Sequence, residues 1–240
     1  MKTLPQILRT LKGIKAAKRY VKNHRPTDRD GGVGRTLEDL VGIKENNVQG
    51  ADGKNIELKS GRKNTNSMMS LVTQAPLPEG ANSRILKLWG YPSKRDKNKP
   101  SLHSDVTPLA FNKIKGKPAL KLVINKKRIF IIDAKRRILG FIEIEKLRQN
   151  FHKKFLEDRI LYVKAQTKEL MGIEWFLYDE AWLIKGFTFQ TFMKRLKDGI
   201  IKYELRIGHY PDGRVHDHGS GFRVLPKNFV LCSTSRKRVL

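Results

Sequence analysis

Apolar residues recur at helical spacing near the start of the chain, at Leu4, Ile7, Leu8, Leu11, Ile14 and Tyr20. Thr3 is suited to cap this helix and Pro5 to stand in its first turn. The opposite face is basic, and it is either solvated or in contact with phosphates. A polar segment, TDRDGGVG, follows, and the amphipathic stretch RTLEDLVGI then predicts a second helix.

The middle of the chain has the pattern of a β-meander. Three apolar runs, ALKLVI, IFIID and ILGFIEI, are separated by the basic turns NKKR and AKRR. A helix is predicted from Ile144 to Phe155, and RILYVKA after it predicts a strand. In FTFQTFMKRLKDG we expect another helix, capped by Thr188 and ended by Gly199.

The last forty residues alternate strand and loop, with strands predicted at IIKYELRIGHY, FRVL and NFVLCS. Helices and strands therefore mix without the regular alternation of a doubly wound sheet, which predicts an α/β fold of the mixed α+β kind. Five aromatic residues lie in apolar stretches and are expected in the core rather than as base-stacking groups: Trp175, Phe176, Trp182, Phe187 and Phe189.

Charge narrows the function. The chain has 50 Lys and Arg against 23 Asp and Glu, a formal net charge of +27, which favours a polyanionic partner. Between Asn112 and Arg137 ten basic residues stand against one acid, so Lys115 and Lys127 are expected to contact phosphates. A membrane surface is the rival partner, but no apolar run is long enough for a spanning helix. Nucleic acid is therefore the favoured partner.

The single cysteine, Cys232, excludes an intramolecular disulfide framework and a cysteine-based zinc cluster. Lys or Arg interrupts every apolar stretch before residue 30, so no secretory signal is recognised. The first 27 residues are basic and lack acids, as in a mitochondrial transit peptide, but they also lack serine. We therefore expect a cytoplasmic protein.

The segment GADGKNIELKS combines acids, a lysine and strand spacing. Alternation in a strand places Glu57 and Lys59 on one face, opposite Ile56 and Leu58, and a hairpin could bring Asp52 alongside Glu57. Asp52 and Glu57 would bind Mg²⁺, and Mn²⁺ could replace it. Lys59 would orient or deprotonate the attacking water during phosphodiester hydrolysis.

Glu38, on the preceding helix, could supply a third carboxylate. Two alternatives stand beside this site. The Glu57 and Lys59 pair could be a surface ion pair of little energetic value, with Glu38 a solvated helix charge. Asp133-Ala-Lys135 repeats the acid-x-lysine spacing, but it falls where a hairpin turn is expected.

The string GVGRTLEDL, followed by D-x4-E-x-K, resembles the active-site entry of the MvaI/BcnI restriction endonucleases. NSMMSLVTQAPLPEGAN and SLHSDVTP are similar to later motifs of that family. The segment LRIGHYPDGRVHDHGSGFRV is similar to its C-terminal strand, basic loop and turn, and it is nearer to MvaI than to BcnI, which has arginine at the position of His218. The resemblance runs from about residue 30 to residue 225.

This resemblance implies a PD-(D/E)xK nuclease with a MutH-like fold and two lobes around a DNA cleft. Residues 1–140 would form the catalytic lobe and residues 141–240 the recognition lobe. The enzyme would be a monomeric type II endonuclease that cuts both strands of DNA at CC-N-GG sites such as CCWGG, leaving 5′-phosphate and 3′-hydroxyl ends. A protective methyltransferase would accompany it in the cell.

Carried over residue by residue, Asp52, Glu57 and Lys59 match the catalytic triad, with the general base left open between Lys59 and a phosphate oxygen. The segment that reads bases matches at Arg206, Tyr210, His216, Asp217, His218 and Arg223. The chemistry agrees, because arginine pairs with guanine and aspartate accepts from cytosine.

Other interpretations remain open at this point. His216, Asp217 and His218 could bind zinc or nickel, and Arg206 could simply pair with Glu204 on its own strand. The whole protein could instead be a methyl-directed, strand-nicking endonuclease like MutH. From another class, it could be a non-catalytic basic nucleic-acid-binding protein.

Overall fold

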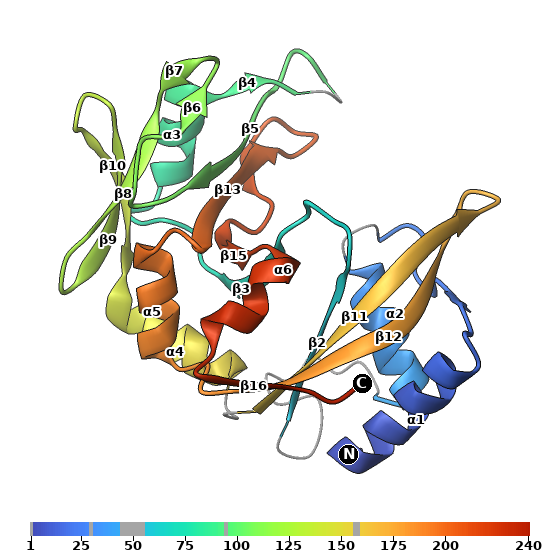
Figure 1. Ribbon diagram of the computed structural model, residues 1–240. Helices are drawn as coiled ribbons and strands as arrows, with labels where there is room; N and C mark the ends of the chain where they lie inside the picture. Colours follow the sequence, from blue (N-terminus) through green and yellow to red (C-terminus); the bar gives the residue numbers. More distant parts are fainter. Residues whose placement is uncertain (1, 29–30, 44–55, 94–95, 156–158) are drawn as a thin grey trace. The chain divides into compact units, whose positions relative to one another are not determined.

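The computed structural model describes residues 2–28, 31–43, 56–93, 96–155 and 159–240 (Figure 1). The chain forms two compact units, and each is assembled from separate segments. Unit 1 comprises Met1–Met69, His152–Thr191 and Leu225–Leu240, and unit 2 comprises Ser70–Phe151 and Phe192–Val224. The predicted lobes divide the chain once, at residue 140, whereas these units interleave along it.

Unit 1 is built on a five-stranded sheet of order β1-β12-β11-β2, with β16 also paired to β12. Its strands are β1 (Val21–Lys22), β2 (Glu57–Arg62), β11 (Arg159–Leu170), β12 (Ile173–Lys185) and β16 (Ser235–Arg238). The hairpin of β11 and β12 is antiparallel, but β2 runs parallel to β11, with Glu57 opposite Ile160. The strand that carries the predicted catalytic residues therefore lies at an edge of this sheet.

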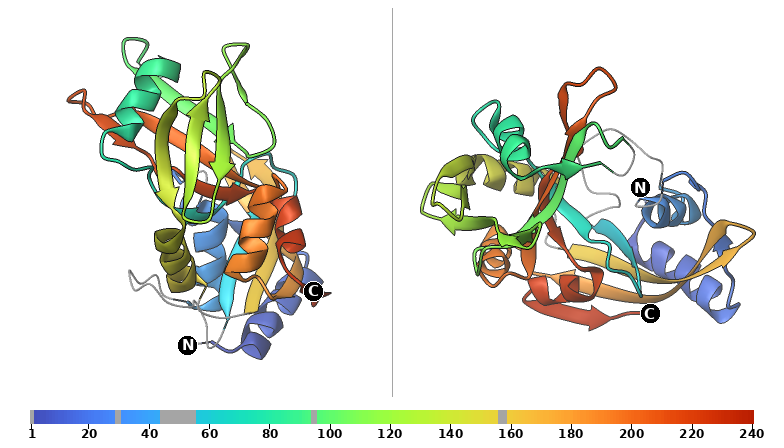
Figure 2. Two further views of the ribbon diagram at one scale, coloured as in Figure 1. Left: turned by 90° about the vertical axis from the view of Figure 1, so that its left-hand side faces the viewer. Right: turned by 90° about the horizontal axis from the view of Figure 1, so that it is seen from above.

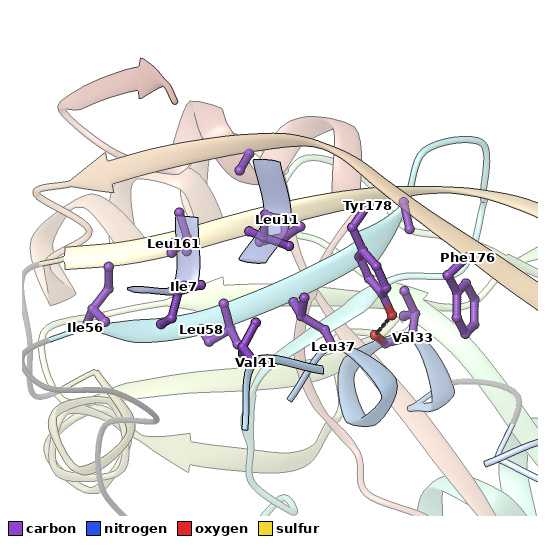
Figure 3. Packing of buried hydrophobic residues seen from close by; sticks show 13 residues of the cluster. Ile7, Leu11, Val33, Leu37, Val41, Ile56, Leu58, Leu161, Phe176 and Tyr178 are labelled. Atoms are coloured by element: carbon purple, nitrogen blue, oxygen red, sulfur yellow. Dashed lines mark hydrogen bonds between the residues drawn. The ribbon is translucent and has the colours of Figure 1, made fainter. Parts of the chain in front are cut away.

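Two helices, α1 (Leu4–Ala16) and α2 (Gly32–Val41), cover one face of the unit 1 sheet (Figure 3). The side chains that alternate toward them, including Leu58 and Leu161, are buried against apolar residues of both helices. The Tyr178 hydroxyl donates a 2.7 Å hydrogen bond to the carbonyl oxygen of Val33 and ties β12 to α2. Hydrophobic burial thus fixes β2 from the side of Leu58.

Aromatic residues cover the opposite face of β11. Phe155, Phe187, Phe229 and Tyr162 form a chain of edge-to-face contacts, with successive ring centroids 5.0, 5.5 and 5.2 Å apart. Phe229 belongs to the short helix α6 (Pro226–Phe229), which a 3₁₀ turn follows. Glu57 and Lys59 are therefore on the side of β2 where these rings pack.

Unit 2 contains a six-stranded sheet of order β3-β15-β13-β5-β4, with β14 paired to β13. Its strands are β3 (Met69–Thr73), β4 (Tyr91–Pro92), β5 (Pro100–Val106), β13 (Ile201–His209), β14 (Val215–Asp217) and β15 (Gly221–Val224). The helices α3 (Ala81–Trp89), α4 (Ile144–Lys154) and α5 (Phe189–Lys197) accompany it. Phe192 joins the helices to the sheet, because its ring lies 5.4 Å from Phe151 and 5.4 Å from Phe222.

The predicted meander is confirmed as a three-stranded antiparallel sheet, whose broad side faces the viewer in the left view of Figure 2. Its strands are β8 (Leu120–Ile124), β9 (Arg128–Asp133) and β10 (Ile138–Glu143). Asp133 is buried in the β9–β10 turn, where it accepts hydrogen bonds from Lys135 and Arg137. A short hairpin, β6 (Lys113–Ile114) and β7 (Lys117–Pro118), precedes the meander.

Most predicted elements are present, and two differ. The first helix ends at Ala16, before Tyr20, because Lys18 adopts a left-handed conformation with φ 46°. The segment NFVLCS is helical in α6 and the 3₁₀ turn Val230–Cys232, so its prediction as a strand was wrong. Pro226 suits a helix start, and Phe229 and Cys232 are buried at helical spacing. No helix in the described ranges is long and apolar enough to cross a membrane.

Candidate functional site

Glu57 and Lys59 lie in contact on β2. The Lys59 ammonium donates to Glu57 Oε1 in an ion pair, so the two side chains share a face, as strand alternation predicts. The same amine lies 3.4 Å from the Leu58 carbonyl oxygen and 6.0 Å from the centroid of the Phe155 ring. Ile56 and Leu58 are buried, and Leu58 packs in the cluster with α2.

Burial distinguishes this pair from a surface ion pair. Only 5% of the Glu57 side chain and 17% of the Lys59 side chain are exposed. A buried carboxylate is costly unless a cation balances it, and here Lys59 is that cation. The site therefore places a buried carboxylate beside an ammonium group, with the Phe155 ring next to that ammonium.

Asp52 and Glu38 are the other two carboxylates predicted for this site. Asp52 lies outside the described residues. Glu38 is partly buried on α2, whose buried residues pack in the same cluster as Leu58. Burial raises the pKa of the Tyr178 hydroxyl; the charge of Arg62 lowers this pKa, and the charges of Glu174 and Glu38 raise it. A joint site of Asp52, Glu38 and Glu57 stays a prediction.

The donor chemistry at Glu57 suits a hard divalent cation, because Mg²⁺ prefers carboxylate oxygens. Over the described ranges, no group of three or more His, Cys, Asp and Glu side chains is arranged to hold a metal ion. That statement includes His216, Asp217 and His218, but it does not extend to Asp52. Glu57 is therefore the described part of the predicted Asp52 and Glu57 pair.

The predicted base-reading residues lie in unit 2, on β13, β14 and β15 and, for Tyr210 and His218, in the loops that join these strands. Arg206 of β13 lies opposite His103 of β5, and the His218 backbone amide donates a 2.7 Å hydrogen bond to the Arg206 carbonyl oxygen. The pairing of β13 and β14 brings His216 opposite Gly208. A Cβ atom at position 208 would lie 2.6 Å from the His218 ring, so glycine leaves room for this imidazole.

Glu204 pairs with Arg223, whose Nε lies 2.6 Å from Glu204 Oε2. These side chains are only 19% and 11% exposed, respectively. One oxygen of the Glu204 carboxylate is thus engaged by the arginine of β15. The alternative pairing of Arg206 with Glu204 stays open.

Three rings extend along the loop that follows β13. The Tyr210 and His216 ring centroids are 4.0 Å apart, and those of His216 and His218 are 4.3 Å apart. Tyr210 is 41% exposed and His218 is exposed, so this chain of rings reaches the surface. Its polar edges can donate to or accept from a ligand.

The protein itself engages the carboxylate of Asp217. Oδ1 accepts hydrogen bonds from the backbone amides of Gly219 and Ser220, and Oδ2 accepts a 2.8 Å hydrogen bond from Asn82. This arrangement stabilises the turn that carries His216 and His218. The role of Asp217 in base reading stays a prediction.

Sequence reasoning missed His103. Burial and the positive charges of Arg206, His218 and Arg223 lower its pKa, which favours a neutral ring that can both donate and accept. The sequence held one sign of this position. His103 is a polar residue in the short strand-like segment SLHSDV, whose apolar Leu102 and Val106 are buried in the structure. Its position opposite Arg206, about a hundred residues later, could not be read from spacing.

Lys115 and Lys127 also lie in unit 2, not in the unit that contains Glu57. The Lys115 amine donates a 2.7 Å hydrogen bond to the Gly90 carbonyl oxygen. Lys127 is exposed in the turn between β8 and β9. Their role as phosphate contacts stays a prediction.

Comparisons with known proteins show the family and the fold. The profile of the MvaI/BcnI restriction endonuclease family matches residues 8–232. A solved structure, "Restriction endonuclease MvaI-cognate DNA substrate complex", is similar over 100% of both chains, with a TM-score of 0.79 and 22% identity.

A second structure, "Restriction endonuclease MvaI in the absence of DNA", is similar over 100% of both chains, with a TM-score of 0.57 and 23% identity. No curated protein sequence matches the chain. The structural likeness shows the PD-(D/E)xK-type fold. Since the family match takes in both the Glu57 strand and the Arg206 to Arg223 segment, the chain belongs to the MvaI/BcnI restriction endonuclease family.

Proposed function

We propose that the chain is a Mg²⁺-dependent type II restriction endonuclease that cuts both DNA strands at a short GC-rich pseudopalindrome of the CC-N-GG type. The products would carry 5′-phosphate and 3′-hydroxyl ends. The observation that carries the proposal is the buried pair of Glu57 and Lys59 on β2, in a chain of a restriction endonuclease family.

Asp52 and Glu57 would hold the metal ion through their carboxylates. When bound there, Mg²⁺ would offset the negative charge of the phosphate and make the attacking water more acidic. Lys59, released from part of its contact with Glu57, would orient that water and stabilise charge that develops on the phosphate oxygens. Phe155, over the Lys59 amine, would limit competing hydration of the ammonium.

Recognition would use the cluster on β13, β14 and β15. The similar MvaI structure is a complex with a cognate DNA substrate, and we propose that this chain also binds duplex DNA. Arg206 and Arg223 would pair with guanines, while Tyr210, His216, Asp217 and His218 would read neighbouring positions. Lys115 and Lys127 would contact phosphates regardless of sequence.

Unit 1 would act as the catalytic lobe and unit 2 as the recognition lobe. The enzyme would work as a monomer in the cytoplasm and nick one strand before the other. A methyltransferase in the same cell would protect its sites.

Digestion of supercoiled plasmid in Mg²⁺ tests the proposal. Wild type is expected to give linear product with unique ends, whereas Glu57→Gln and Lys59→Ala should lose at least a hundredfold in rate, about 3 kcal/mol in barrier. Glu145→Gln and Lys227→Ala make the same kinds of change at exposed positions and should cut like wild type.

Three results would contradict the proposal. Wild type would show no cleavage, or the Glu57 and Lys59 variants would cut as well as wild type. Alternatively, open circles that persist and depend on hemimethylation would identify a strand-nicking enzyme. Sequencing the fragment ends from an unmethylated phage genome would give the site itself.

A further inference from the structure

The outer face of the meander carries a row of apolar side chains. Val123, Phe130 and Phe141 occupy paired positions on β8, β9 and β10, and Leu77 pairs with Phe141 through two backbone hydrogen bonds of 2.7 Å. Directly paired residues of antiparallel strands point to the same side of a sheet, so the row is continuous. Val123 is 41% exposed, Leu77 is 40% exposed, and the two rings are partly exposed.

A second, parallel row consists of Lys121, Ile132 and Ile138, and Ile138 is 61% exposed. The opposite face of the meander packs in the hydrophobic core, where Leu122, Ile129, Ile131 and Ile142 are fully buried. An antiparallel sheet with one buried face normally presents polar residues on the other. This outer apolar surface is therefore a candidate for binding.

Basic groups surround the two rows. The Arg128 guanidinium lies over the Phe141 ring, 4.2 Å from its centroid, and the turns at either end add Lys126, Lys127, Lys135 and Arg136. Asp133 is buried and bonded to Arg137, and the exposed Glu143 pairs with Arg128, with Oε1 4.0 Å from the guanidinium, so the basic groups outnumber the exposed acid. The surface thus combines flat groups available for stacking with a positive rim.

Exposed rings beside basic side chains favour one kind of ligand over others. A single-stranded nucleic acid presents unpaired bases, which stack on aromatic rings and arginine planes, together with phosphates for the rim. A duplex keeps its bases stacked inside and offers mainly phosphates there, so the apolar rows would have no partner. A second copy of the chain would bring another formal charge of +27 against the first.

We infer that the outer face of the meander binds single-stranded nucleic acid, with unpaired bases stacked on Phe130, Phe141 and the Arg128 guanidinium. Phosphates lie at the lysines and arginines of the rim. The stacking groups include no residue assigned to cleavage or to base reading, so the inference does not rest on the proposed function. Lys127 lies at the rim and would serve phosphates of either kind of strand.

The test measures fluorescence anisotropy of labelled oligo(dT), with EDTA present so that nothing is cut. Wild type is expected to bind oligo(dT) about fivefold or more tightly than an abasic oligonucleotide of equal length, as one stacked base implies. The double variant Phe130→Leu, Phe141→Leu keeps apolar side chains but loses both rings, and it should lose this preference. Tyr20→Leu removes a ring that lies under Lys168 in unit 1 and should keep it.

Thermal unfolding first checks that the double variant folds. If it does not, Arg128→Lys replaces it, since this change keeps the charge and removes the stacking plane. Oligo(U) in place of oligo(dT) shows whether the surface also binds RNA. Binding of either ligand supports the inference if it depends on the Phe130 and Phe141 rings.

The inference is overturned if the abasic strand binds wild type equally well, or if the folded double variant keeps the preference for oligo(dT) over the abasic strand. Plasmid cleavage by the double variant should match wild type. The two proposals therefore fail separately.

Discussion

Three acidic residues in this basic chain are held by different kinds of partner. Asp133 is bonded to the backbone and guanidinium of Arg137, and Asp217 to two backbone amides and Asn82. Glu57 is paired with the side chain of Lys59, which has four rotatable bonds. The Lys59 side chain is flexible, so this contact can open without unfolding the chain, as the proposed role of Glu57 in metal binding requires.

Asp217→Ala should lower the free energy of unfolding by about 1–3 kcal/mol, because it leaves two partly buried backbone amides and Asn82 without their acceptor. Urea denaturation at neutral pH measures the loss. Asp212→Ala is the matched control in the same loop, since Asp212 is exposed and bonded to Arg214, and it should change stability by less than about 0.5 kcal/mol. Equal effects of the two substitutions would contradict this structural role for Asp217.

At the scale of elements, the hairpin of β11 and β12 carries a charged network beside the edge strand β2. Glu180 accepts a 2.6 Å hydrogen bond from Trp182 and lies 2.9 Å from the Lys164 amine and 3.3 Å from that of Lys63. Burial alone would raise the pKa of Glu180, but the hydrogen bonds from Trp182 and Lys164, with the charge of Lys164, lower it to about 2. The network therefore links β12 to β11 and to the segment after β2.

A lowered pKa means that Glu180 stabilises the fold at pH values above its unfolded pKa, and that this contribution is lost as the pH falls toward 2. Glu180→Gln should cost on the order of 2 kcal/mol at pH 7, and the difference from wild type should shrink from about pH 4 downward. Urea denaturation as a function of pH measures this. Glu169→Gln, at the exposed end of β11, should differ little from wild type at any pH. A pH-independent cost at Glu180 would argue against the ionised network.

Local patterns predicted the elements that local forces determine. Thr188 accepts a hydrogen bond from the Thr191 amide at the start of α5, and Gly199 follows the helix with φ 71°, as expected for a cap and a stop. NFVLCS was misassigned because an apolar run that short fits a strand or a helix equally well, and contacts of Phe229 with Tyr162 and Phe187 decided it.

In the candidate sites too, contacts between residues close in sequence could be predicted and contacts between distant segments could not. Strand alternation predicted that Glu57 and Lys59 share a face. Spacing could not predict that His103 lies opposite Arg206, or that Asn82 holds Asp217, because these contacts join strands and helices far apart in the chain. The burial of Glu57 was equally hidden, since the ring over the Lys59 amine belongs to Phe155, almost a hundred residues later.

For the whole molecule, unit 2 contains both the residues proposed to read bases and the basic turns, and we expect specific and nonspecific contacts to be separable by mutation. Lys127→Gln and Lys115→Gln should weaken binding to cognate and random duplex alike, and each should reduce the slope of log K against log salt concentration by about 0.9. Arg206→Ala should instead cost about 1–3 kcal/mol on cognate DNA and little on random DNA. Binding assays over a salt series measure both, and the reverse pattern would mean that the two sets of residues have been assigned the wrong roles.

The parallel pairing of β2 with β11 has a consequence for synthesis of the enzyme. Residues 57–62 pair with residues 160–165, so a ribosome must add roughly a hundred residues before the strand with Glu57 and Lys59 can join its sheet. Until then the strand that carries Glu57 and Lys59 lacks the neighbouring strand that fixes its register. The proposed cleavage activity is therefore expected only after residues 160–165 have been made and have paired with this strand.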